Sequence, residues 1–143
     1  MSSAVAGISR IAIAAVVAEL LAILSLVGVI VFVYASEPLS FGQGERLARE
    51  IANWVIPIAG FVPCLLAGWW AVRKLLASHV QRGIAVGVAA VILDIAFLVW
   101  LGAPFRFVFV IAVIGRIAGG GLGGLLASRR AARKEAIQPF VAA

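Results

Sequence analysis

The chain has 143 residues, of which 64% are hydrophobic and only 13% are charged, and its net charge is +6. A soluble domain carries about 25% charged residues, and at this length it leaves about 30% of its unfolded-chain surface exposed. Too few polar side chains are present to cover such a surface. This excludes a soluble enzyme, a secreted disulfide-rich domain, a disordered tail and a nucleic-acid-binding module, and a polytopic membrane protein remains.

Four apolar segments predict an all-α integral membrane protein with four transmembrane helices in one domain covering residues 1–143. Each segment is close to the ~20 residues that cross ~30 Å of hydrocarbon as a helix, and none alternates polar and apolar residues as barrel strands do. The first is longer than the apolar core of a signal peptide, so we expect it to be retained. The predicted spans are residues 11–34, 53–72, 83–101 and 107–127, followed by a basic tail at 128–143.

The second segment contains features of its own. Pro57, Gly60 and Pro63 are expected to bend this helix, either as a static kink or as a hinge. Before them, residues 45–56 have an amphipathic pattern with two i,i+4 ion pairs. We interpret this stretch as an outward extension of the second helix, with a lid or partner-docking helix as the alternative.

Basic residues are distributed unequally between the two sides of the membrane, which predicts the orientation. Eight lie on the side that carries both termini: Arg10, Arg73, Lys74, Arg82, Arg129, Arg130, Arg133 and Lys134. Three lie on the other side, at Arg46, Arg49 and Arg106. The bias indicates a bacterial-type inner membrane with both termini cytoplasmic. We expect Arg129, Arg130, Arg133 and Lys134 to contact anionic lipid headgroups.

Three ionisable residues, Glu19, Asp94 and Arg116, interrupt the apolar segments. At ~1.5 Å per residue, Asp94 and Arg116 lie at one level near the midplane, on the two sides of a predicted turn. We therefore expect an ion pair that sets the register of the third helix against the fourth. Glu19, counted from Ile11, lies shallower, but its side chain is long enough to join them.

The inclusion of Glu19 would give these residues a functional role. Two carboxylates and one guanidinium leave one negative charge in excess, and low dielectric disfavours that charge, so one acid should hold a proton near neutral pH. A carboxyl that exchanges a proton at mid-membrane is typical of proton-coupled carriers.

Glycines recur every four residues along the fourth segment, as Gly115, Gly119 and Gly123 and again as Gly120 and Gly124. Such glycine-zipper spacing lets helix backbones approach closely and specifies packing rather than chemistry. The sequence leaves open whether this stripe packs inside the monomer or across a homodimer. Because the glycines leave more than one helix face bare, self-association is the favoured interpretation.

An internal similarity relates residues 65–74 to residues 125–134, with six of ten positions identical at an offset of 60. Helices one and three also carry one acidic residue each. The pattern suggests two helical hairpins in a parallel repeat, although chance similarity between Leu-, Ala- and Arg-rich segments is an equal alternative.

No catalytic constellation is recognisable, and the single Cys64 and single His79 give no metal-binding or haem-binding set. We therefore expect no enzyme activity and no cofactor. The first hypothesis is a non-catalytic membrane component that assembles with itself or with a partner membrane protein through the glycine stripe. The alternative is a small solute or proton-coupled transporter that uses Glu19, Asp94 and Arg116.

Overall fold

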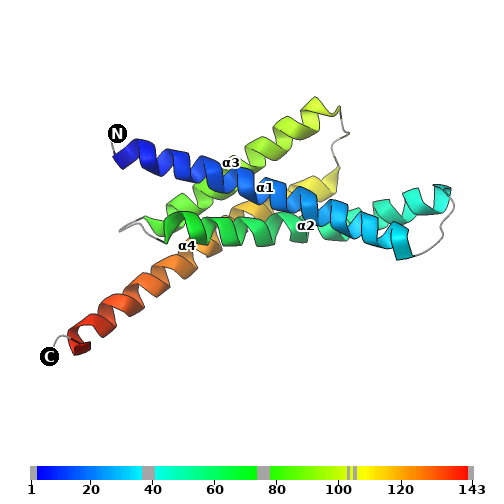
Figure 1. Ribbon diagram of the computed structural model, residues 1–143. Coiled ribbons are helices and arrows are strands. Elements are labelled where there is room, and N and C mark those ends of the chain that lie inside the picture. Colours follow the sequence, from blue (N-terminus) through cyan, green and yellow to red (C-terminus); the bar gives the residue numbers. More distant parts are fainter. Residues whose placement is uncertain (1–2, 37–40, 74–77, 103, 105, 142–143) are drawn as a thin grey trace.

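The computed structural model describes residues 3–36, 41–73, 78–102, 104 and 106–141. These residues form four helices. Side chains are described for these residues except 3–6, 41, 48, 52 and 134–141. The helices are α1 (Ser3–Ser36), α2 (Phe41–Val72), α3 (His79–Trp100) and α4 (Phe107–Val141) (Figure 1). Each contains a stretch long and apolar enough to cross a membrane: Gly7–Ser36, Asn53–Val72, His79–Trp100 and Phe107–Arg133. The prediction of an all-α fold with four spans is confirmed.

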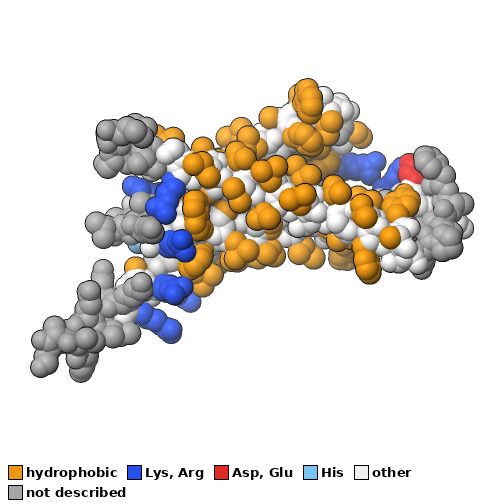
Figure 2. Space-filling view, in the orientation of Figure 1, with side chains coloured by type: hydrophobic (Ala, Val, Ile, Leu, Met, Phe, Trp, Pro, Cys, Tyr) orange, Lys and Arg blue, Asp and Glu red, His pale blue; other side chains and the backbone are white. Residues whose placement is uncertain are grey.

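Successive helices run in opposite directions, so both termini lie at the same end of the molecule (Figure 1). Six of the described arginines lie at that end, which we call the basic end, and Figure 2 shows blue side chains there. The basic end comprises Arg10, Arg73, Arg82, Arg129, Arg130 and Arg133. Between the two ends the surface is largely apolar, as expected for side chains that face acyl chains rather than water.

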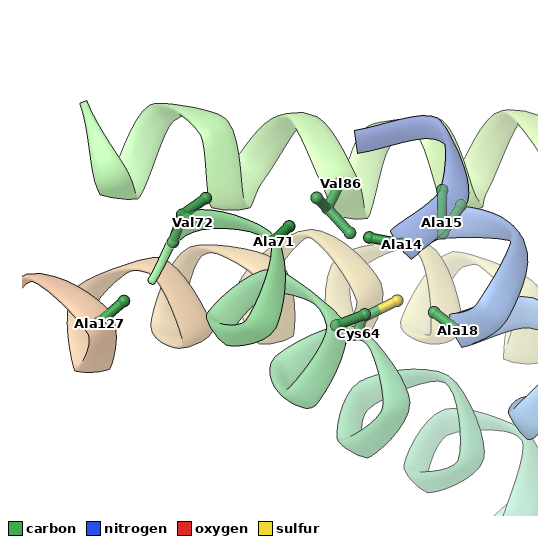
Figure 3. Packing of buried hydrophobic residues seen from close by; sticks show 10 residues of the cluster. Ala14, Ala15, Ala18, Cys64, Ala71, Val72, Val86 and Ala127 are labelled. Atoms are coloured by element: carbon green, nitrogen blue, oxygen red, sulfur yellow. The ribbon is translucent and has the colours of Figure 1, made fainter. Parts of the chain in front are cut away.

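Small side chains form the core of the bundle. Ala14, Ala15 and Ala18 of α1 are buried beside Cys64 of α2 and Val86 of α3 (Figure 3). Most of the large apolar side chains of α1 point outward instead, among them Leu20 and Leu24. Between helices in a bilayer, close packing of small residues replaces the hydrophobic drive of a soluble core, so this arrangement suits the composition.

Helix α4 lies between α2 and α3, and its glycines face both neighbours. A β-carbon at Gly119 would lie 3.3 Å from the backbone nitrogen of Leu65, and one at Gly123 would lie 2.7 Å from that of Trp69, so this row contacts α2. The other row faces α3: a β-carbon at Gly120 would lie 3.0 Å from the Gly87 nitrogen. Both rows are therefore occupied by helices of the same chain, and they give no support to an intermolecular glycine interface.

Helix α3 contributes glycines of its own at this contact. Gly83 and Gly87 face Gly120 and the backbone at Arg116, so that the two helices meet backbone to backbone. The four-residue spacing of Gly83 and Gly87 is the same small-residue signal as that of α4. The sequence therefore contained the signal for this contact in the third segment as well as in the fourth, where we had predicted it.

The amphipathic stretch at residues 45–56 is part of α2, which runs unbroken from Phe41 through both of its prolines. Its two i,i+4 ion pairs are present and exposed: Arg49 Nη2 lies 2.7 Å from Glu45 Oε1, and Arg46 Nε lies 3.3 Å from Glu50 Oε1. The expected outward extension of the second helix is therefore what the structure contains. Exposed pairs of this kind stabilise a helix by only about 0.3–0.5 kcal/mol.

Replacing Gly120 by alanine is expected to destabilise the bundle by about 1–3 kcal/mol, the usual cost of over-packing, because the new β-carbon would collide with the carbonyl oxygen of Gly83. Gly28→Ala is the matched control, since no atom lies within 4 Å of a β-carbon there. Chemical unfolding in a mild detergent, followed by circular dichroism, measures both variants. Equal stability of the two variants would contradict the close contact between α4 and α3.

Candidate functional site

The centre of the bundle holds a buried guanidinium. Arg116, on α4 between the two glycine rows, has a side chain that is only 4% exposed. A charge at this depth costs about 2.5–3.5 kcal/mol on insertion scales unless it is paired. Its partners therefore decide whether the bundle is stable.

Glu19 of α1 is the closest partner of Arg116. The Nε of Arg116 donates to Glu19 Oε1 at 2.6 Å, and Nη2 donates to Oε2 at 3.2 Å. Two parallel N–H···O bonds between a guanidinium and a carboxylate form the strong, geometrically specific kind of ion pair. The carboxylate is almost as buried as its partner, with 11% of the Glu19 side chain exposed.

Asp94 of α3 is the second partner. Its Oδ1 lies 3.3 Å from Arg116 Nη2, with 16% of the Asp94 side chain exposed. The predicted pairing of Asp94 with Arg116 is present, but it is the longer of the two contacts. The same Nη2 atom thus faces both carboxylates, and the three residues form one cluster, which we call the charge cluster: Glu19, Asp94 and Arg116.

Counted from Ile11, Glu19 lies eight residues into the first apolar segment (19 − 11), or ~12 Å at ~1.5 Å per residue, whereas Arg116 precedes Ser128 by 12 residues (128 − 116), or ~18 Å. The expectation that the Glu19 side chain is long enough to join Asp94 and Arg116 is confirmed, because the two side chains together cover this difference in depth.

The charge cluster joins α1 to α4 across a gap. In the described part of the chain, α1 packs on α2 and α3 and makes no close backbone approach to α4. Arg116 spans this distance with its side chain, which reaches Glu19 past the α2 and α3 backbones. Packing on α2 and α3 thus positions α1, and the pair of charges is its direct link to α4.

Two glycines make room for Arg116. A β-carbon at Gly60 of α2 would lie 2.8 Å from Arg116 Nη1 and 3.2 Å from Cζ, and one at Gly87 of α3 would lie 2.8 Å from the Ile117 Cα. Gly60 thus leaves space for the guanidinium, and Gly87 lets the α4 backbone approach α3. From the sequence we predicted that Gly60, together with Pro57 and Pro63, forms a kink or hinge. In the structure Gly60 lies beside the guanidinium of the charge cluster.

One donor of the cluster has no hydrogen-bond partner among the described residues. Nη1 of Arg116 is buried and makes no hydrogen bond to any described group. Leaving a buried donor unpaired costs about 1–3 kcal/mol. The guanidinium is therefore hydrogen-bonded on the side that faces Glu19, whereas its buried Nη1 on the side of Gly60 makes no hydrogen bond to a described group.

Cys64 of α2 is buried in the same part of the core, with 1% of its surface exposed, and it is unpaired as the single cysteine must be. Ser25 of α1 donates its hydroxyl to the carbonyl of Leu21 at 2.7 Å, a bond within its own helix. Among the described residues no three side chains of histidine, cysteine, aspartate or glutamate come together as metal ligands. The ionisable side chains that meet at the centre of the bundle are thus the two carboxylates and the guanidinium of the charge cluster.

At the basic end, arginines stack on two tryptophans of α2. The guanidinium carbon of Arg10 lies 5.3 Å from the centre of the Trp70 ring. Trp69 is contacted by Arg73 at 5.4 Å and by Arg130 at 5.7 Å. Cation–π contacts hold a guanidinium in place while leaving its N–H edges free to bind an anion.

The other predicted headgroup contacts are placed at the same end. Arg129 and Arg133 are exposed on α4, and the side chain of Lys134 lies outside the described residues. Arg130 is the member of the set with an additional contact, because it reaches Trp69. The two segments with internal similarity, 65–74 and 125–134, thus touch each other at the basic end.

No protein-family model, no curated protein and no solved structure matches this chain. The site is therefore interpreted from its own geometry.

Replacing Arg116 by alanine is expected to lower the free energy of unfolding by about 3–5 kcal/mol, because both acids would remain buried without a counter-charge. Chemical unfolding in a mild detergent measures this loss.

A double-mutant cycle of Glu19→Gln with Arg116→Gln should give a coupling of about 0.5–3 kcal/mol. The cycle of Asp94→Asn with Arg116→Gln should give a smaller coupling, since that contact is longer. Strictly additive losses in both cycles would show that the charge cluster is not formed.

Proposed function

We propose that the protein is a small proton-coupled carrier in which the charge cluster binds and releases a proton. The observation that carries the proposal is that two carboxylates, Glu19 and Asp94, share the single guanidinium of Arg116 at the centre of the bundle. With all three groups ionised the cluster has a net charge of −1, and binding of one proton makes it neutral. An intramembrane ionisable group of this kind is by default a functional group.

The way α1 is held supports a mechanism for coupling. Of the four candidate spans, α1 has the smallest buried share, and its contact with α4 runs through Glu19 and Arg116. A proton on Glu19 removes the charge that holds Arg116, so α1 can shift against α2–α4. A proton bound in one position of α1 and released in another is the elementary step of coupled transport.

The proposal is non-catalytic. The hydroxyl of Ser25 is engaged with its own helix, and the acids of the charge cluster are paired with Arg116 rather than with a nucleophile. The proposal concerns the proton and names no transported solute, because the described groups of the charge cluster are two carboxylates and one guanidinium.

Assembly with a partner membrane protein is the second candidate function, and one observation favours it. Helix α4 continues past the end of the bundle as far as Val141 and projects away from the other helices (Figure 1). A projecting helix offers a docking segment outside the membrane. This version of assembly relies on the end of α4 and not on the glycine rows, which are occupied by α2 and α3.

Glu19→Gln is expected to abolish proton exchange while leaving the protein folded, because glutamine retains hydrogen-bonding capacity toward Arg116 but cannot lose a proton. Two measurements on protein in liposomes check this: proton flux under an imposed membrane potential, reported by an internal pH-sensitive dye, and the infrared carbonyl band of a protonated carboxylic acid between acid and neutral pH. Glu45→Gln is the control, since Glu45 is exposed and outside the cluster. A wild-type protein without flux and without a titrating carboxyl band would contradict the carrier.

The same variants separate the two candidates. A subunit that works by assembly should keep its crosslinks to neighbouring membrane proteins in Glu19→Gln and lose them when residues 134–143 are removed. A carrier should show the reverse pattern.

The orientation belongs to this proposal as well. We place the basic end on the cytoplasmic side of a bacterial inner membrane, with both termini inside, because positive residues favour that side and this end holds six of the described arginines, Arg10, Arg73, Arg82, Arg129, Arg130 and Arg133. Single cysteines in a Cys64→Ala background test it. A cysteine at Gly42, at the opposite end, should react with a membrane-impermeant maleimide in intact cells, and one at Arg133 should react only after lysis. Labelling of both positions from outside, or of Arg133 alone, would contradict the orientation.

A further inference from the structure

An apolar groove runs between α1 and α2 on the outer surface of the bundle. Its part nearer the basic end has a volume of about 240 Å³ and is lined by residues that include Ala14, Val17 and Trp70. A second part, of about 480 Å³, continues toward the opposite end as far as Val29 and Val55. The two parts share Leu21, Pro63 and Leu66, so they form one continuous depression.

The described residues that line the groove are almost entirely apolar. The two with a polar side-chain group are Ser25, whose hydroxyl already donates to the Leu21 carbonyl, and Trp70, whose indole N–H belongs to the end of the groove near Arg10. From Trp70 to Val55 the groove follows 15 residues of α2 (70 − 55), or ~22 Å at 1.5 Å per residue. An elongated apolar occupant fits this shape, whereas a polar solute does not.

A positive charge closes the groove at the basic end. Arg10 lies one turn before Ala14 on α1, and its guanidinium stacks on the ring of Trp70 at 5.3 Å, so it is held at the point where the lining ends. Arg82 of α3 adds a second guanidinium nearby, since its Nη1 would lie 3.8 Å from a β-carbon at Gly7 on α1. Apolar walls with arginines at one end match an anionic amphiphile.

We propose that this groove binds one anionic phospholipid, with its phosphodiester on Arg10 and an acyl chain along Pro63 and Leu66. The guanidinium offers the N–H groups that phosphate oxygens accept, and stacking on Trp70 fixes it without occupying all of them. The lipid is distinct from the bulk bilayer because its head and its tail are recognised at once.

Charge favours this occupant over a second copy of the chain. Copies inserted in one orientation would bring a basic end to the groove next to Arg10, and like charges in contact repel. An anionic headgroup instead compensates Arg10. The inference does not depend on proton exchange, because lipid retention is measured without a proton gradient.

The full-length protein is reconstituted in vesicles of equal parts phosphatidylglycerol and phosphatidylcholine, extracted in a mild detergent and analysed by native mass spectrometry. The wild type should retain phosphatidylglycerol over phosphatidylcholine by about tenfold, because both lipids offer a phosphodiester to Arg10 but the choline cation of phosphatidylcholine is repelled by the guanidinium. Arg10→Gln should remove this preference, and Arg106→Gln, which changes an exposed arginine at the opposite end, should keep it.

The acyl-chain part of the proposal has its own matched pair. Val17 lines the groove and Val16 does not, yet both are 45% exposed. Val17→Trp should fill the groove and abolish retention of both lipids, whereas Val16→Trp should retain them as the wild type does. Circular dichroism verifies that each variant is folded.

A measurement on the wild type covers the case in which a variant does not fold. Phosphatidylglycerol with brominated acyl chains should quench the fluorescence of Trp70 more strongly than brominated phosphatidylcholine does, with Trp70→Phe as the reference for the other tryptophans. Equal quenching by the two lipids, or equal retention of both, would overturn the site. A Val17→Trp protein that changes its oligomeric state and keeps its lipid would show that a second copy occupies the groove instead.

Discussion

The guanidinium of Arg116 is the constraint around which this bundle is organised. A charge buried to this degree must be paired, and its partners come from two other helices, Glu19 on α1 and Asp94 on α3. The third neighbour, α2, contributes space in the form of Gly60. All four helices thus surround one side chain, and the direct link between α1 and α4 is the ion pair of Glu19 with Arg116.

Glycines at the helix contacts allow the long side chain of Arg116 to lie inside the bundle. With Gly120 against Gly83 and Gly119 against the α2 backbone, α4 approaches both neighbours to backbone contact. Van der Waals contact between backbones then supplies the association energy that apolar side chains cannot supply in lipid. The same close approach brings Arg116 within reach of carboxylates on helices that would otherwise lie too far apart.

The sequence predicted those parts of the structure that depend on the bilayer alone. Length and hydropathy define the four helices and their alternating direction, and a charge that must be neutralised at depth indicates the pairing of Asp94 with Arg116. It did not identify Glu19 as the closer partner, because residue counts give the depth of a side chain but not the direction in which it points from its helix. Nor could it show which neighbours the glycine rows face or where the α1–α2 groove lies. Both depend on how each helix is rotated about its axis, and the spacing of residues along the chain does not determine that rotation.

The contact of Gly83 with Gly120 has a consequence for how this protein can change over evolution. A new side chain in an ordinary core is often accommodated when its neighbour becomes smaller. Here both residues already lack a side chain, so neither can compensate for the other. A second substitution that restores the fold must therefore displace a whole helix, and this backbone contact will leave no pairwise covariation among homologous sequences.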